Sequence, residues 1–203
     1  MKNNFSTGEN AMILQAENYV KELMSSDSSG HDYEHIQRVT NQALKLAKHY
    51  PCDTFVVLLA AILHDIDDPK LNVLPSEKVK TFLNQTELSD DRKKHILEIT
   101  HNLSYTKSKK GIKVDSIEGK IVQDADRLDA IGAVGIARCF AYGGAHSRPI
   151  YSGSVDDESS LAHFYQKLLK LKDLMNLEES KRIAIERTDF MELYLRTFFE
   201  EIK

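Results

Sequence analysis

One segment of twelve residues, FVVLLAAILHDI at positions 55–66, constrains the fold more than any other part of the chain. As a helix it would carry apolar side chains on all sides, which predicts a helix buried at the centre of a bundle. The segment ends in the pair His64-Asp65, and burying an imidazole beside a carboxylate is costly unless something compensates both groups. A metal ion would do so, because neutral imidazole and ionised carboxylate are the forms that metal ions bind.

The apolar periodicity is helical along nearly the whole chain, without β-type alternation of any length and without an internal repeat. Pro69 should end the central helix near Asp68, because proline disfavours helical geometry at the preceding residue. Small residues at 132–137 indicate close helix–helix contact, and Gly143-Gly144 should end that helix before a Gly/Ser/Pro loop. The helices expected from these patterns cover about 13–23, 32–50, 53–68, 76–84, 89–103, 116–142, 158–174 and 178–202.

Length and charge limit the architecture and the partners. A chain of 203 residues has room for one full-sized core, so we expect a single all-α domain over 1–203, frayed at 1–10. A formal net charge of −4 argues against a broad surface for extended nucleic acid. The first ten residues lack the apolar core of a signal peptide, and the apolar run is too short to span a bilayer. We therefore expect a cytoplasmic protein with no membrane partner.

Some features admit two interpretations at this stage. The basic run at 107–113 is either a solvated loop or a mobile flap that attracts a small polyanion. The apolar segment at 190–199 is either a homodimer surface or the closing part of the bundle. Cys52 and Cys139 are expected to be reduced thiols, because neither lies in a paired-thiol motif.

Two further residues are plausible partners of His64-Asp65 at one ion. His35 lies upstream in His-x-x-Arg-Val, and Asp126 lies downstream in Gln-Asp-Ala-Asp-Arg-Leu-Asp. Two imidazoles and two carboxylates suit a divalent ion such as Mn²⁺, Fe²⁺, Co²⁺ or Ni²⁺. Adjacent helical residues point about 100° apart, so His64 and Asp65 can reach one ion only at or beside a helix end. The helix end expected before Pro69 would meet this condition.

Three ordered motifs resemble those of the HD-domain metal-dependent phosphohydrolases. They are HDYEHIQRV at 31–39, LHDIDDPK at 63–70 and QDADRLDA at 123–130, and the resemblance extends over roughly 20–175. Three such motifs in order on helical segments are far more specific than an isolated His-Asp pair. Within this family the chain is most similar to the bacterial YpgQ/YedJ-like nucleotide pyrophosphohydrolases.

The resemblance implies an all-helical fold of the HD-domain type and one bound divalent ion. Mn²⁺ is expected first, with Co²⁺, Ni²⁺, Fe²⁺, Mg²⁺ or Zn²⁺ as alternatives. The residues alone do not decide between Asp124, Asp126 and Asp129, which share one predicted helix; the family pattern selects Asp126. The implied metal ligands are His35, His64, Asp65 and Asp126.

Catalysis would also require a base and contacts to phosphate. Asp68 lies three residues after Asp65 and would face the same side if the last helical turn persists, and similar proteins carry an acidic residue there. It is therefore the expected base or water-orienting residue. Asp67 would lie at the surface or behind a ligand. The expected substrate contacts are His31, Arg38, Lys70, His101, His146 and Arg148.

These substrate contacts have structural alternatives. Arg38 could instead pair with a nearby carboxylate, His31 could merely begin its helix, and His101 could be structural. A second metal ion would need His95 and His101 together. Their offset of six residues turns them about 240° apart on a regular helix, so a single ion is favoured.

The function implied by the resemblance is hydrolysis of nucleotide phosphates by a metal-bound water. The most specific form is cleavage of (deoxy)nucleoside triphosphates to monophosphate and pyrophosphate, with a small nucleotide as the partner. The alternatives are a 5′-nucleotidase, a phosphodiesterase, or a metal-bound nucleotide sensor without catalysis. Retention of Asp68 together with the four ligands argues against a pure sensor.

Overall fold

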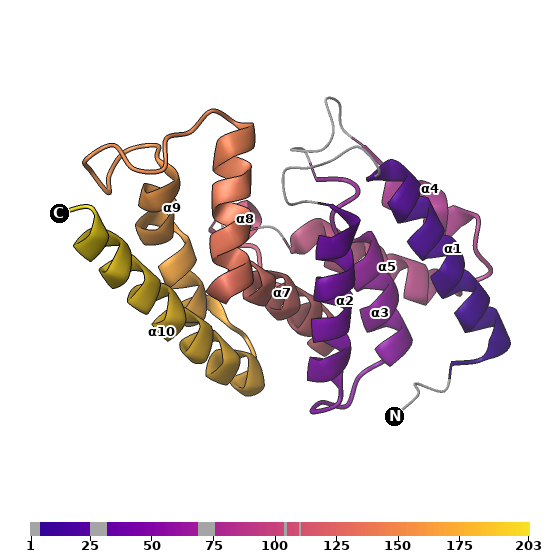
Figure 1. The fold of residues 1–203 in the computed structure, drawn as a ribbon. Helices are drawn as coiled ribbons and strands as arrows, with labels where there is room; N and C mark the ends of the chain where they lie inside the picture. Colours follow the sequence, from indigo (N-terminus) through magenta and orange to yellow (C-terminus); the bar gives the residue numbers. More distant parts are fainter. Residues whose placement is uncertain (1–4, 25–31, 69–75, 104, 110) are drawn as a thin grey trace.

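The structure, a computed structural model, describes residues 5–24, 32–68, 76–103, 105–109 and 111–203. These residues form helices and connecting segments and contain no β-strand, which confirms the all-α prediction (Figure 1). The helices are α1 (Thr7–Leu23), α2 (Tyr33–Ala47), α3 (Thr54–Leu63), α4 (Lys78–Asn84), α5 (Asp90–Asn102), α6 (Tyr105–Lys109), α7 (Ile117–Asp129), α8 (Gly132–Ala145), α9 (Ser160–Gln166), the 3₁₀ helix η1 (Leu168–Leu174) and α10 (Glu178–Glu201). Within these residues no helix is both long enough and apolar enough to cross a membrane.

The helix α3 forms the centre of the N-terminal group of helices, as the apolar run predicted. Every residue from Phe55 to Leu63 is buried, and α3 packs against α1, α2, α5 and α7. Asp53 caps its N-terminus, where the side chain accepts hydrogen bonds from the backbone N–H groups of Phe55 and Val56. A helix surrounded on all sides has no solvent-facing stripe, which explains the absence of polar residues before His64.

The helix α7 joins the two groups of helices seen in Figure 1. It packs against α2, α3 and α5 on one side and against α8 and α10 on the other. Consequently most of its residues are buried, including the charged residues Glu118, Asp124, Arg127 and Asp129. Each of these needs a partner inside the protein, because an unpaired buried charge is strongly destabilising.

The central helix ends earlier than the sequence predicted. It stops at Leu63, and His64 to Asp67 form a turn in which the backbone N–H of Asp68 donates to the carbonyl of Asp65 at 2.9 Å. The expected end near Asp68 is therefore wrong by about one helical turn. Pro69, which was expected to end the helix, lies outside the described residues.

The single helix expected over 116–142 is two helices, α7 and α8, separated by a turn at Ala130 and Ile131. Gly132 has φ +77°, a left-handed conformation that is costly for residues with a Cβ atom. A Cβ on Gly132 would also lie 3.0 Å from the Arg187 side chain of α10. At the other end, α8 continues through Gly143-Gly144 to Ala145, so these glycines do not end it.

Other predicted boundaries also differ from the structure. The helix α1 begins at Thr7 with Ser6 as its N-cap, although 1–10 were expected to be frayed and the first helix to start near 13. The segment 158–174 is divided into α9 and the 3₁₀ helix η1. The basic run at 107–113, for which no helix was expected, overlaps the short helix α6. Residues 190–199 close the bundle on one side: Met191 and Leu195 are buried, and the Tyr194 ring stacks on Phe164 at 6.1 Å. Phe190, by contrast, is 48% exposed. The homodimer stays a prediction.

Gly132→Ala should destabilise the protein by about 1–2 kcal/mol, because the left-handed backbone disfavours a Cβ and Arg187 crowds the position. Urea denaturation would measure the change. Gly144→Ala is the matched control: it lies in the same helix with nothing within 4 Å of the added carbon. That substitution should be neutral or slightly stabilising. Equal unfolding free energies for the two variants would contradict this role of Gly132.

Candidate metal centre

Three side chains from different helices converge at one point. His35 comes from the first turn of α2, His64 caps the C-terminus of α3, and Asp126 lies near the end of α7. One ligand atom from each lies within 4.8 Å of the others, so together they could hold a metal ion. Asp126 Oδ1 lies 3.6 Å from His35 Nε2 and 3.9 Å from His64 Nε2.

Asp65 lies beside the same two imidazoles. Its Oδ2 is 3.3 Å from His35 Nε2, and its Oδ1 is 3.3 Å from His64 Nε2. The helix α3 ends at Leu63, and the adjacent residues His64 and Asp65 reach the same point beyond it, with His64 Nε2 and Asp65 Oδ1 only 3.3 Å apart. The early helix end thus meets the condition that the sequence imposed on this pair.

The protonation pattern of His64 favours a metal ligand. Its Nδ1 lies 2.9 Å from the Ala61 carbonyl, which can only accept a hydrogen bond, so Nδ1 carries the proton. The remaining nitrogen, Nε2, then presents a lone pair toward Asp65 and Asp126. It is buried and makes no hydrogen bond within the part of the chain that the structure describes. A divalent ion would satisfy this nitrogen together with both carboxylates, so the residues present fit the group.

Asp129 supports His35 from behind. Its Oδ2 lies 2.8 Å from His35 Nδ1, opposite the nitrogen that faces Asp65 and Asp126. Arg38 donates to both carboxylate oxygens, at 2.8 Å from Nε and 3.2 Å from Nη2, and Arg138 Nη1 donates at 2.7 Å. A carboxylate that holds the far nitrogen of a histidine sets its ring orientation and raises its basicity as a ligand.

These contacts affect the charge of both partners. Burial opposes ionisation of Asp129, but the hydrogen bonds from His35 and Arg38 hold its pKa well below its usual value. Burial of the His35 ring lowers its pKa, yet the hydrogen bonds to Asp129 and Asp65 outweigh this and raise the pKa to about 9. The site therefore stabilises a positive charge on His35 Nε2, the position where a metal ion would replace the proton.

Asp124 has a structural role instead. It is fully buried and accepts hydrogen bonds from the Asn176 backbone at 3.0 Å, the Asn176 side chain at 2.7 Å and the Leu177 backbone at 2.9 Å. Burial raises its pKa, although these hydrogen bonds favour the ionised form. Asp124 thus attaches α7 to the segment that begins α10. Of the three aspartates that the residues alone left open, only Asp126 joins the metal group.

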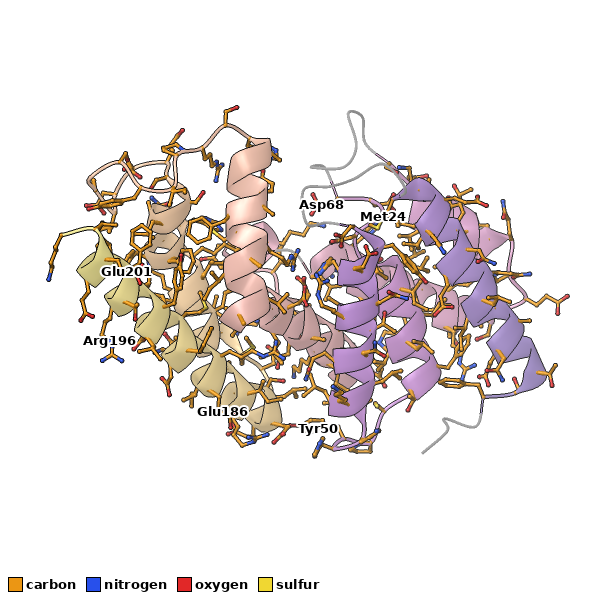
Figure 2. The ribbon with its side chains drawn as sticks, viewed as in Figure 1. Met24, Tyr50, Asp68, Glu186, Arg196 and Glu201 are labelled. Atoms are coloured by element: carbon orange, nitrogen blue, oxygen red, sulfur yellow. The ribbon has the colours of Figure 1, made fainter. Side chains whose placement is uncertain are left out.

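Asp67 caps the following helix. Its carboxylate accepts hydrogen bonds from Ser76 Oγ at 2.6 Å and from the backbone N–H groups of Lys78 and Val79, at 2.8 and 3.1 Å. These N–H groups begin α4, where negative charge is favourable. Asp68 is half-buried, and in the view of Figure 2 it lies near the N-terminal end of α2, with Tyr50 at the opposite end.

The predicted substrate contacts have different surroundings. Arg38 pairs with Asp129, which is the structural alternative considered for it. His101 is exposed at the end of α5. His146 is also exposed and stacks on Tyr142, with ring centroids 3.9 Å apart. His31 and Lys70 lie outside the described residues, and the assignment of any of these residues to substrate binding stays a prediction.

One metal group occurs within the described residues. His95, a candidate ligand for a second ion, lies with its Nε2 3.7 Å from Glu118 Oε2 instead. Reasoning from the sequence missed the supporting role of Asp129. The available signal was its position three residues after Asp126, which places both on neighbouring parts of the helix surface.

Comparison with known proteins gives consistent results. The family model described as HD domain matches residues 32–131. The uncharacterized protein YpgQ of Bacillus subtilis is 38% identical over 192 residues, which cover 93% of this chain and 92% of YpgQ. The crystal structure of YpgQ in complex with ADP has a TM-score of 0.80 at 39% identity, over 94% of this chain and 97% of that one. An HD-superfamily hydrolase from Bacillus thuringiensis has a TM-score of 0.78 at 41% identity, over 95% and 97%.

Asp129→Asn should weaken Mn²⁺ binding by about 10–100-fold, because His35 loses the carboxylate that orients it. Isothermal titration calorimetry measures the affinity, and thermal unfolding shows whether the variant stays folded. Asp124→Asn provides the comparison on the same helix. It should lower the unfolding temperature while leaving the metal affinity of the folded protein unchanged. Unaltered Mn²⁺ affinity in Asp129→Asn would refute the supporting role.

Proposed function

The chain belongs to the HD-domain family of metal-dependent phosphohydrolases, and from this premise we propose that it hydrolyses (deoxy)nucleoside triphosphates to monophosphate and pyrophosphate. The observation that carries the proposal is the convergence of His35, His64 and Asp126, with one buried imidazole nitrogen directed at the carboxylates. A nucleotide substrate is supported by the similar protein YpgQ, which has been crystallised in complex with ADP.

In this proposal His35, His64, Asp65 and Asp126 hold one divalent ion, with Mn²⁺ expected first. Asp65 is included because its two oxygens each lie 3.3 Å from one of the histidines. When bound, such an ion lowers the pKa of a water molecule and polarises a phosphoryl oxygen. The donor set contains no thiolate, which distinguishes it from a structural zinc site.

Asp68 is proposed as the base that orients the water and accepts its proton. The preceding residue, Asp67, is committed to the N-terminus of α4 through three hydrogen bonds. Asp68 follows the turn that carries His64 and Asp65, so in the sequence it lies only three residues after the proposed ligand Asp65. As the water oxygen attacks the α-phosphorus, the bond to the bridging oxygen breaks and pyrophosphate leaves with the bonding electrons.

The phosphate contacts proposed beside this centre are Arg148, His101 and His146, with His31 and Lys70. Arg38 is assigned a different role, because its guanidinium already binds both oxygens of Asp129. We propose that Arg38 acts through Asp129 to position His35 and does not grip phosphate.

Full-length protein incubated with Mn²⁺, Co²⁺ or Mg²⁺ and a panel of nucleotides should release pyrophosphate from nucleoside triphosphates. Chromatography of the nucleotide products and a pyrophosphate assay measure the reaction. Orthophosphate from monophosphates would instead identify a 5′-nucleotidase, and activity only on diesters would identify a phosphodiesterase. Binding of nucleotide without hydrolysis under all three metals would reject the enzyme hypothesis.

Asp68→Asn should lower kcat by about 10²–10⁴-fold, because the water loses its base, while metal content stays at the wild-type level. His64→Ala should lose the metal itself, as measured by elemental analysis of the purified protein. Asp67→Asn is the neighbouring control: it should reduce thermal stability by weakening the start of α4 but keep most of the turnover. Depletion of metal in Asp68→Asn would reverse its assignment from base to ligand.

A further inference from the structure

A cavity of about 420 Å³ lies between α8 and α9, beside the turn that connects α7 to α8. This volume is within the range of pockets that hold small molecules. None of the four proposed metal ligands lines it. The residues that matter for its chemistry are Arg138 and Tyr142 from α8, Arg148 from the following loop, and Ser159, His163 and Lys167 around α9.

The cavity is cationic. Among the described residues that line it are three permanently charged cations, Arg138, Arg148 and Lys167, and one acidic residue, Glu158. Glu158 is exposed, whereas the Arg138 side chain is only 16% exposed. A partly enclosed surface with an excess of positive charge favours an anion, and two guanidinium groups suit the oxygens of phosphate in particular.

Two of these cations are held in place before any ligand binds. The Arg148 guanidinium lies over the Tyr142 ring at 5.3 Å, and the Lys167 ammonium lies over the Tyr105 ring at 5.0 Å. The backbone N–H of Arg148 also donates to the Gly143 carbonyl at 2.8 Å. Side chains that are already ordered lose less entropy when they bind a ligand.

The backbone around the cavity is closely packed. A Cβ on Gly143 would lie 2.0 Å from Ser160 Oγ, so α8 and the start of α9 approach here as only glycine permits. The loop is attached to the same point, since Ser160 donates its N–H to the Pro149 carbonyl at 2.9 Å. This attachment keeps Arg148 next to the cavity.

Arg138 connects the cavity to the metal centre. Its Nη1 lies 2.7 Å from Asp129 Oδ2, and the same oxygen lies 2.8 Å from His35 Nδ1. The cavity is therefore two hydrogen bonds away from a proposed metal ligand. In the proposed function the α-phosphorus of a triphosphate lies at the metal centre, and Arg138 is the residue shared by the cavity lining and the hydrogen bonds around Asp129.

We infer that this cavity binds the diphosphate portion of the substrate, its β- and γ-phosphates, through Arg138, Arg148 and Lys167. The inference rests on the proposed function. It adds a reason why hydrolysis would occur at the α-phosphorus and not at the terminal phosphate. With the two terminal phosphates held in the cavity, the α-phosphorus is the one presented to the attacking water. The leaving group is then pyrophosphate.

Inorganic pyrophosphate is the probe for this site. Isothermal titration calorimetry of the full-length protein, first without added divalent ion, should detect binding that is at least tenfold weaker in the double variant Arg148→Ala/Lys167→Ala. In the Mn²⁺-loaded enzyme the same variant should raise KM for a nucleoside triphosphate by tenfold or more, with metal content unchanged. Lys170→Ala, an exposed lysine one turn from Lys167, should match the wild type in both measurements. If the double variant does not fold, the same two measurements on the single variant Arg148→Ala, at an exposed position, test the inference.

The outcomes separate this inference from the proposed function. Pyrophosphate binding that is absent in the wild type, or equal in all variants, overturns the inference even when nucleotide hydrolysis is intact. Loss of pyrophosphate binding with an unchanged KM also overturns it, because the cavity would then bind a separate polyphosphate. If no nucleotide is hydrolysed, the proposed function fails, and the calorimetric result still shows whether the cavity binds a diphosphate.

Discussion

The mutual repulsion of carboxylates near the C-terminal ends of α3 and α7 is the constraint on which the rest of the structure depends. Asp65, Asp126 and Asp129 all lie within 3.6 Å of a nitrogen of His35. Such a group of negative charges is stable only with positive charge among them. Arg38 and Arg138 supply it behind Asp129. A metal ion held by His35, His64, Asp65 and Asp126 would supply it on the other side of His35. The positions of both arginines follow from this requirement.

The motif at 123–130 shows how one helix can serve several purposes. Successive residues of a helix point in different directions, so Asp124 faces the start of α10, Asp126 faces the metal centre, and Asp129 faces His35 and two arginines. Arg127 donates to the Leu174 carbonyl and, at 3.2 Å, to Ser108 Oγ. The motif therefore contains many charged residues for two reasons: several of them bind neighbouring elements of α7, and Asp126 belongs to the metal group.

Much of this could be predicted from the sequence. The buried central helix and the convergence of His35, His64 and Asp126 followed from local patterns and from the family motifs. The helix end at Leu63 could not be predicted, because it results from a turn formed by backbone hydrogen bonds. Such bonds do not depend on a particular residue type. The break before Gly132 was also missed, because the apolar stripe of α7 continues through Ile131 as if the helix did. The supporting role of Asp129 was missed because its partners His35, Arg38 and Arg138 belong to other helices.

The attachment of Asp124 to Asn176 and Leu177 has a thermodynamic consequence for the whole chain. The helix that presents Asp126 to the metal centre also fastens the beginning of α10, whose far end packs among the aromatic residues of the second group of helices. An ion that binds only the folded protein stabilises every contact that unfolds together with its site. Through α7, the C-terminal helix is linked to the candidate metal centre, and the amide hydrogens of α10 should exchange more slowly when an ion is bound there.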